Sequence, residues 1–328
     1  MKKTKILITG VAGFIGMKVA EKILSNSGNN EVVGLDNINS YYDQGLKLDR
    51  LKILKNYTNF QFIKADLKDY NKLKNTLYKI RPQVVINLAA QAGIRATIKS
   101  PSSYLNSNVI GFYNLLESIK NLNIKHFLFA SSSSVYGTNT KMPFSEESRT
   151  DEPLNLYAAT KKSNEILSYS YSHVYGIPTT GLRFFTVYGP WGRPDMLPMK
   201  LVHSINNGKI LDLYNHGKSY RDFTFIDDVT TVILKLINKP PKKTVKFKVK
   251  YNIFNIGNSH PILISKFIKE VEKVLEKKAK LNKVKINHLD MKSTYSDTKK
   301  LFKFIRYKPK TSIHEGIIKL IDWYDKYY

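Results

Sequence analysis

The sequence contains no cysteine and no uncharged apolar run of about 18 residues, the length that a membrane-spanning helix requires. Without cysteine the chain cannot form disulfides, attack a substrate with a thiolate or bind zinc or iron–sulfur clusters through sulfur. Its 328 residues, 42% of them apolar, suffice for a core in one large or two modest domains. We therefore expect a soluble, cytoplasmic globular protein without a membrane partner.

Acidic residues and arginine are scarce, whereas lysine is abundant. Asp and Glu number 26 against 53 Lys and Arg, and only 8 of the basic residues are arginine, so the net charge is +27. A charge of this size invites a nucleic-acid partner. However, the lysines are scattered, and asparagine, isoleucine and tyrosine are abundant too, which indicates a general residue bias. We predict a solvated lysine surface and no nucleic acid; an anionic partner, such as a small phosphorylated substrate, is the alternative.

The N-terminal segment MKKTKILITGVAGFIG combines a basic start with an apolar middle, as a signal peptide does. Three glycines interrupt its apolar part, Lys18 and Glu21 follow closely, and no small-x-small cleavage site is present. We expect no targeting segment here.

Short apolar strands alternate with amphipathic helices in the first half of the chain. Such strands, separated by helices, predict a parallel sheet covered on both faces, and right-handed crossovers make it doubly wound. The predicted strands are Lys5–Thr9, Glu31–Leu35, Phe60–Lys64, Gln83–Leu88, Lys125–Ala130 and Thr179–Phe184. The predicted helices are Phe14–Ser25, Tyr70–Lys79, Tyr104–Ile119 and Leu156–Val174, with later ones near Ile264–Lys278 and Ile313–Tyr328.

The regular alternation of apolar strands and amphipathic helices ends after about Thr186. We therefore predict an α/β fold with a Rossmann domain over residues 1–185 and a smaller α/β substrate domain over residues 186–328. Some segments of the second part are expected to return to the large sheet.

The glycine-rich segment Gly10-Val11-Ala12-Gly13-Phe14-Ile15-Gly16 follows the first strand and opens the first helix. A tight turn, close phosphate approach and helix–strand packing each require a glycine there, and the helix N-terminus then faces a pyrophosphate. Asp36 ends the second strand, where a carboxylate binds both ribose hydroxyls of adenosine and repels a 2′-phosphate. The pattern predicts NAD rather than NADP. Asp66, after the third strand, is a weaker candidate for the adenine edge.

Tyr157 and Lys161 are spaced i, i+4 on a predicted helix and share one face. The pair alone is weak evidence, because Tyr70/Lys74, Tyr214/Lys218 and Tyr295/Lys299 have the same spacing. Only Tyr157 follows the fifth strand and the serine run 131–134, at the edge of the sheet where ligands bind. We predict that Tyr157 is a catalytic base whose phenolate is stabilised by Lys161 and the nicotinamide cation.

Together these features resemble the extended short-chain dehydrogenase/reductase family, in its NAD-dependent epimerase/dehydratase branch. Over nearly its whole length the chain is most similar to UDP-glucuronate 4-epimerases. The resemblance is carried by long segments such as GLDNINSYYDQGLK, NLAAQAGIR, SSSSVYG, LYAATKKSNE, PTTGLRFFTVYGPWGRPDM and YNHGKSYRDFTFIDDV.

The resemblance implies an NAD-dependent conversion of UDP-glucuronate to UDP-galacturonate through a 4-keto sugar. Tyr157 would remove the hydroxyl proton at carbon 4, with Lys161 and Ser132 completing the catalytic group. Implied cofactor contacts are Gly10, Gly13, Phe14, Ile15, Gly16, Asp36, Asp66, Leu67, Ala89, Ala90, Tyr157 and Lys161. Implied substrate contacts are Arg95, Ser133, Ser134, Thr186 and Arg193, the last four around the sugar carboxylate, and Arg221 at the diphosphate.

Arginine usage agrees with these assignments. Of the eight arginines, Arg95, Arg183, Arg193 and Arg221 lie in the segments that carry the resemblance. The rigid guanidinium fork binds carboxylate or phosphate in a bidentate manner, which lysine cannot do. Ordinary structural ion pairs are the alternative for any one of them.

Other functions remain as alternatives. Sugar 4,6-dehydratases carry Asp-Glu just after the catalytic Ser or Thr, whereas this chain has Ser133 and Ser134 and thus no acid/base pair for elimination. Epimerases of UDP-glucose, a UDP-hexosamine or UDP-N-acetylglucosaminuronate stay open, because Ala96 and His288-Leu289-Asp290 depart from the family pattern. A non-catalytic dinucleotide sensor is expected to lack the Tyr157/Lys161 pair.

The resemblance also implies a homodimer. Helices Tyr104–Ile119 and Leu156–Val174 would pair with their copies in a four-helix interface. The candidate contact residues are Phe112, Leu116, Ile166 and Tyr169.

Overall fold

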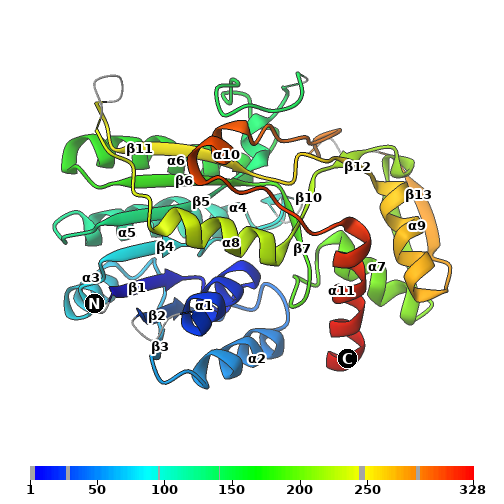
Figure 1. Cartoon of the computed structure of the whole chain (residues 1–328), viewed down its shortest axis with the longest axis horizontal. Helices are drawn as coiled ribbons and strands as arrows, with labels where there is room; N and C mark the ends of the chain where they lie inside the picture. The colour runs from blue at the N-terminus through cyan, green and yellow to red at the C-terminus, as the bar shows by residue number, and fades with distance from the viewer. Residues whose placement is uncertain (1–3, 27–29, 95–96, 140, 244–247, 286–288) are drawn as a thin grey trace.

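A seven-stranded, all-parallel sheet forms the centre of the computed structural model (Figure 1), which describes residues 4–26, 30–94, 97–139, 141–243, 248–285 and 289–328. The strand order is β11-β6-β5-β4-β1-β2-β3. The strands are β1 (Thr4–Thr9), β2 (Asn30–Asp36), β3 (Phe60–Lys64), β4 (Val84–Asn87), β5 (His126–Ser132), β6 (Thr179–Phe184) and β11 (Tyr251–Ile256). The chain reverses its direction of winding between β1 and β4, and ligands bind at such a switch point.

Helices cover both faces of this sheet, and each face has its own hydrophobic core. One core contains residues of α1 (Phe14–Asn26), α2 (Gln44–Lys55) and α8 (Ile226–Ile237); the other contains residues of α3 (Tyr70–Ile80) and α5 (Gly111–Ile119) and packs against α6 (Leu156–Tyr175). Ile6 and Ile8 of β1 enter the first core, and Leu7 enters the second. Both faces of central strands such as β1, β4 and β5 are therefore buried, which explains their apolar sequences, whereas the edge strand β3 is only partly buried.

The C-terminal part of the chain builds the lobe at the right of Figure 1. Its helices are α7 (Leu197–Asn206), α9 (Ile264–Leu275) and α11 (Ile313–Tyr327), whereas α10 (Lys299–Ile305) lies against β11 and α8 of the large sheet. Its strand pairs are β7 (Thr186–Tyr188) with β10 (Phe223–Phe225), β8 (Ile210–Tyr214) with β13 (Lys280–Val284), and β9 (Tyr220–Arg221) with β12 (Ile262–Leu263). Strand β11 adds to the edge of the large sheet instead, and the α1/α8 core continues into α7, α9 and α11. The domain boundary at residue 186 stays a prediction.

The predicted elements of the large sheet agree with the structure. All six predicted strands are present, with ends within two residues of those expected. The helix expected over Tyr104–Ile119 is present, but its predicted start is wrong: the helix begins at Pro101 as α4 (Pro101–Tyr104) and continues through a π-helical turn, η2 (Leu105–Ile110), into α5. Within the ranges that the structure describes, no helix combines the length and the hydropathy needed to cross a membrane.

Two of the four expected dimer contacts are also wrong. Phe112 and Leu116 are each only 1% exposed, because they face the sheet and pack in the core between α3, α5 and β5. Ile166 and Tyr169 on α6 are 60% and 51% exposed, so their side chains do face outward.

Candidate active site

The glycine turn after β1 is the first part of the site. Gly10 has a φ of +70°, and a Cβ there would lie 2.6 Å from the backbone nitrogen of Ala89. A Cβ on Gly16 would lie 2.2 Å from the carbonyl oxygen of Gly10. Only glycine fits at these two positions, and the turn delivers the chain to the N-terminus of α1, which begins at Phe14. The amides of residues 10–13 donate within the protein, so the amides that begin α1, from Phe14 onward, are the ones that can receive a phosphate group.

Asp36, at the end of β2, is fixed beside this turn. Its carboxylate accepts hydrogen bonds from the backbone N–H groups of Ala12, at 3.0 Å, and Ile38, at 2.8 Å. Burial raises the pKa of Asp36, while these two N–H groups act in the opposite direction. A carboxylate has about four acceptor positions, so two remain for the hydroxyls of a ribose.

Asp66 lies near the next strand end and is bound more locally. It accepts hydrogen bonds from the side chain of Asn37 and from the backbone N–H of Lys68. Burial alone would raise the pKa of Asp66, but these two donors and the charge of Lys68 outweigh it and lower the pKa. Asp66 is therefore a charged hydrogen-bond acceptor at neutral pH.

All these groups line one cleft with a volume of about 1010 Å³. It runs from the glycine turn along the carboxyl edge of the sheet to β8, β9 and the segment 289–294. Every sequence-predicted site residue that the structure describes lines this cleft: Gly10, Gly13, Phe14, Ile15, Gly16, Asp36, Asp66, Leu67, Ala89, Ala90, Ser132, Ser133, Ser134, Tyr157, Lys161, Thr186, Arg193 and Arg221. Arg95, Ala96 and His288 lie outside the described residues.

The expected catalytic group meets at the middle of the cleft. Ser132 ends β5, and its side chain is in hydrogen-bonding contact with Tyr157 near the start of α6. Lys161 is one helical turn further along α6 and donates a 2.8 Å hydrogen bond from Nζ to the carbonyl of Ala130. Its Nζ lies 5.8 Å from the ring centroid of Tyr157. The helix begins here because Asn155 caps the N–H of Ala158 at 2.9 Å.

The buried position of this group changes its proton affinities. Burial lowers the pKa of Lys161 to about 8, so the ammonium form still predominates at pH 7. Burial raises the pKa of Tyr157, while the hydrogen bond from Ser132 and the charge of Arg193 act to lower it. The direction for Tyr157 is opposite to the one expected with a nicotinamide cation beside it. Residues of the protein alone therefore do not create the phenolate.

Two arginines at the substrate end are held in different ways. Arg193 forms a bidentate pair with Asp195, from Nε to Oδ1 at 3.0 Å and from Nη2 to Oδ2 at 2.5 Å. Arg221 donates instead to backbone carbonyls, including that of Tyr220 at 2.8 Å and that of Met291 at 2.8 Å. These carbonyl oxygens orient the guanidinium, and a guanidinium fork can bind a diphosphate ligand.

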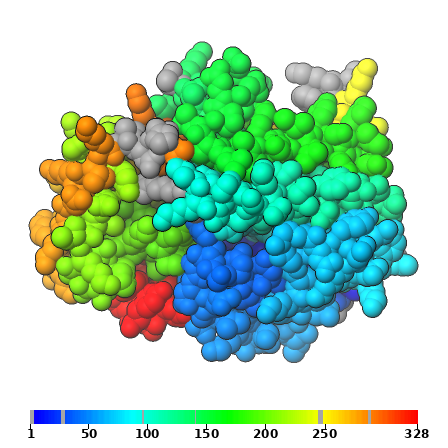
Figure 2. Space-filling view, turned by 180° about the vertical axis from the view of Figure 1, so that it is seen from behind, coloured from blue at the N-terminus to red at the C-terminus, as the bar shows by residue number. Residues whose placement is uncertain are grey.

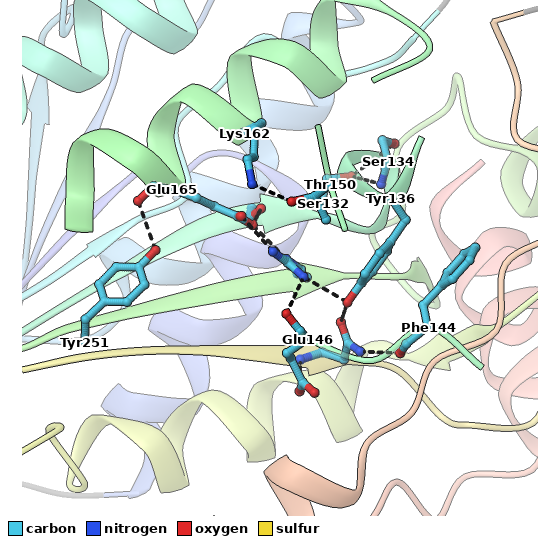
Figure 3. Close-up of polar contacts among 12 residues, drawn as sticks. Ser132, Ser134, Tyr136, Phe144, Glu146, Thr150, Lys162, Glu165 and Tyr251 are labelled. Atoms are coloured by element: carbon cyan, nitrogen blue, oxygen red, sulfur yellow. Dashed lines mark hydrogen bonds and ion pairs between the residues drawn. The ribbon is translucent and has the colours of Figure 1, made fainter. Parts of the chain in front are cut away.

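Arg183, the fourth arginine of the sequence motifs, is an internal structural group. It forms a bidentate ion pair with Glu165 in which both bonds are 2.8 Å long and both side chains are 4% exposed (Figure 3). The same carboxylate accepts a hydrogen bond from Ser131, and Arg183 also donates to the hydroxyl of Tyr136. Tyr136 in turn donates to Asn255 of β11. This network ties β5, β6, α6 and β11 together directly beneath the serine run.

Sequence reasoning missed residues that fix the geometry of the cleft. Arg50 on α2 is completely buried and donates to the carbonyl of Ala12, at 2.9 Å, and to that of Trp191, at 2.6 Å. It thereby joins the glycine turn to the loop that carries Arg193. Its signal was available, since Arg50 is one of only eight arginines in a lysine-rich chain. Tyr41 and Asp195 contact each other although they are 154 residues apart in the sequence, and no local sequence pattern predicts this contact.

The residues present fit a dinucleotide cofactor. Glycine at positions 10 and 16 lets the turn pack closely against β4 and α1, the N-terminus of α1 opens into the cleft where a pyrophosphate fits, and Asp36 lies where a ribose diol is bound.

Comparisons with known proteins agree with this geometry. A sequence profile of the family described as GDP-mannose 4,6 dehydratase matches residues 7–320. Protein CapI of Staphylococcus aureus is 46% identical, with 99% of both chains covered, and a probable UDP-glucuronate 4-epimerase of Rhizobium meliloti is 40% identical, with 99% of this chain and 98% of that protein covered. A UDP-glucuronic acid 4-epimerase of Bacillus cereus, solved with UDP-glucuronic acid and NAD, superposes with a TM-score of 0.91 at 33% identity over 99% of this chain and 100% of that one. The chain therefore belongs to the GDP-mannose 4,6 dehydratase family and, within it, groups with the UDP-glucuronate 4-epimerases.

Proposed function

We propose that the protein is an NAD-dependent 4-epimerase that interconverts UDP-glucuronate and UDP-galacturonate through a 4-keto sugar. The observation that carries this proposal is that one cleft contains the glycine turn, the Tyr157 group and Arg193 with three hydroxyl side chains. Similarity to UDP-glucuronate 4-epimerases along the whole chain supports it.

Tyr157 is the proposed base for the carbon-4 hydroxyl. Ser132 contacts Tyr157 directly and orders the proton path between the sugar hydroxyl and the phenol. Lys161, held on the carbonyl of Ala130, places a positive charge beside the ring and favours the phenolate. When bound at the glycine turn and Asp36, NAD would supply the hydride acceptor and donor for carbon 4. The chain's own residues thus supply proton transfer and orientation.

A second set of residues is proposed to hold the two charged parts of the substrate. Ser133, Ser134 and Thr186 supply hydroxyl donors, and Arg193 supplies a charged fork for the sugar carboxylate. Arg221, oriented by backbone carbonyls at the far end of the cleft, is proposed to bind the diphosphate. Gly10, Gly13, Phe14, Ile15, Gly16, Asp36, Asp66, Leu67, Ala89 and Ala90 are proposed to hold the cofactor.

The direct test is to incubate the purified protein with UDP-glucuronate, without added cofactor, and to follow the anomeric protons by NMR. Conversion to UDP-galacturonate is expected, because a cofactor regenerated in each turnover stays bound. UDP-glucose serves as the comparison substrate. Equal turnover of the two sugars would favour a neutral-sugar epimerase and contradict the uronic acid assignment.

The protein should contain bound NAD when purified and prefer it to NADP. Asp36 would repel the 2′-phosphate of NADP, and a preference of about a hundredfold or more is expected from two like charges in contact. Release by denaturation followed by chromatography identifies the nucleotide, and calorimetry gives the two affinities. Tighter binding of NADP would show that the role given to Asp36 is wrong.

We also propose a homodimer. Exposed large apolar side chains concentrate on the neighbouring elements η2, α5 and α6, which lie side by side as the teal and green bands of Figure 2. They are Leu105, Ile110, Tyr113, Ile166, Tyr169, Val174 and Tyr175. Because these exposed apolar side chains lie on elements that pack against one another, a second copy of these helices is the proposed cover.

Substitution of Ile166 by lysine should dissociate this dimer, because a charged side chain would then be buried at the centre of the apolar contact. Light scattering at micromolar concentration should show a dimer for the wild type and a monomer for the variant. Ile210, which is 70% exposed but lies on β8, provides the matched control, and Ile210→Lys should stay dimeric. A monomeric wild type would contradict the proposal.

We also propose that the protein is located in the cytoplasm. NAD and UDP-sugars are available there, and a chain without cysteine needs no oxidising compartment in which to fold. Cell fractionation tests this prediction.

A further inference from the structure

The pair formed by Arg193 and Asp195 is built into a single loop. The two residues are separated only by Pro194, and the loop between β7 and α7 turns here, with the N–H of Met196 donating to the carbonyl of Arg193 at 3.2 Å. Both side chains line the cleft, and they are only 18% and 29% exposed. Asp195 binds Nε and Nη2, so the Nη1 end of the guanidinium is not used by this pair.

Asp195 is also held from its other side. The hydroxyl of Tyr41 donates to Oδ2 of Asp195 at 3.3 Å, and the ring of Tyr41 lies 5.8 Å from Cζ of Arg193. Tyr41 lies beside Tyr104, whose hydroxyl donates to the carbonyl of Gly93 at 2.6 Å. The ring of Tyr104 packs edge-on against Tyr157, with 6.4 Å between centroids. Asp195 is therefore a fixed part of the cleft wall, close to the catalytic group.

This arrangement places a carboxylate of the protein beside the arginine that is proposed to bind the carboxylate of the sugar. Two carboxylates at one guanidinium repel each other and compete for its hydrogen bonds. A site designed only for tight binding of an anion would omit Asp195. The presence of Asp195 therefore indicates that some step of the reaction benefits from weaker binding of the sugar carboxylate.

The proposed reaction contains a step that benefits from weaker binding. The 4-keto sugar must rotate in the cleft so that each face of carbon 4 meets the cofactor in turn, and during this rotation its carboxylate must leave Arg193. A partly buried guanidinium without any partner is costly. If the sugar carboxylate were the only partner of Arg193, rotation of the sugar would leave the guanidinium charge unpaired, and the rotation would be slow. With Asp195 bound throughout, the guanidinium stays paired while the sugar turns.

Resting on the proposed function, we propose that Asp195 is a positioning residue that acts as the internal counter-ion of Arg193. It holds one edge of the guanidinium, restricts the sugar carboxylate to the other edge, and limits the affinity for the uronic acid so that the sugar can turn.

The test compares the affinities of UDP-glucuronate and UDP-glucose for the NAD-loaded protein by calorimetry, since these ligands differ only at the carboxylate. Asp195→Asn keeps the size of the side chain and one acceptor but removes the charge. We expect this variant to bind UDP-glucuronate about tenfold more tightly, while UDP-glucose binding changes less than twofold. Its kcat with UDP-glucuronate should fall about tenfold and its KM should fall with it.

Two further variants make the result specific. Asp195→Glu keeps the charge and should restore the wild-type ratio of the two affinities. Asp151→Asn removes the aspartate of another Arg-x-Asp pair, Arg149–Asp151, which is exposed and lies outside the cleft, and it should change neither ligand. Equal weakening of both ligands by Asp195→Asn, or an unchanged ratio, would overturn the counter-ion role. A wild type without preference for UDP-glucuronate would instead overturn the proposed substrate, and this inference with it.

Discussion

Replacement of Tyr157 by phenylalanine should lower kcat for UDP-glucuronate about a thousandfold while leaving substrate affinity nearly unchanged. The substitution removes the proton acceptor at carbon 4 and almost no volume, and loss of a general base typically costs factors of this size. Lys161 remains in place but cannot replace Tyr157 as the base, because its Nζ is held on the carbonyl of Ala130. Steady-state kinetics gives kcat, and calorimetry gives the affinity.

The chain provides a matched control for this substitution. Tyr70 and Lys74 have the same i, i+4 spacing on α3, and Nζ of Lys74 lies 5.6 Å from the ring centroid of Tyr70, close to the corresponding 5.8 Å of the Lys161–Tyr157 pair. Tyr70 does not line the cleft, so Tyr70→Phe should retain full activity. A Tyr157→Phe variant with a tenth of the wild-type activity would rule out Tyr157 as the base.

Arg193→Ala should raise the KM for UDP-glucuronate about tenfold and increase the formation of a UDP-pentose by-product by a similar factor. The 4-keto form of a uronic acid is a β-keto acid, which loses carbon dioxide when the bond to the carboxylate lies perpendicular to the ketone plane. Charge-assisted hydrogen bonds from Arg193 and the hydroxyls of Ser133 and Thr186 would hold the carboxylate near that plane. Each such bond contributes about 1.5–3 kcal/mol, enough to shift the rotamer population tenfold.

NMR or chromatography of the products measures both quantities at once. Arg149→Ala serves as the control, since Arg149 also pairs with an aspartate two residues along but is exposed outside the cleft. An Arg193→Ala variant with an unchanged KM and unchanged products would show that this arginine does not bind the sugar carboxylate.

Central strands such as β1, β4 and β5 could be predicted from sequence because they are buried on both faces and are therefore largely apolar. The π-helical turn η2 could not be predicted, since its contacts are made only in the folded chain. Asn108 lies in this π-helical turn and binds both the N–H and the carbonyl of Gln91, in the loop after β4. The dimer contacts failed in part for a related reason: α5 is apolar on more than one side, so periodicity does not reveal that Phe112 faces the sheet.

The site residues also divide into those that sequence motifs predict and those whose role only the folded structure reveals. Gly10, Asp36 and Tyr157 belong to motifs with fixed positions at strand ends, and their place in one cleft follows from the parallel sheet. Arg183 has the same motif signal as Arg193, yet it pairs with Glu165 inside the protein. Burial and partners decide between these two uses of an arginine, and neither can be read from residue type.

In the proposed reaction, carbon 4 of the sugar is inverted by removing a hydrogen and returning it to the same carbon inside the cleft. The most direct measurement uses UDP-glucuronate labelled with deuterium at carbon 4 and follows the products in ordinary water by NMR and mass spectrometry. We expect UDP-galacturonate that retains the deuterium at carbon 4, because the hydrogen never exchanges with solvent. Loss of the label to water, or the absence of any galacto product, would contradict it.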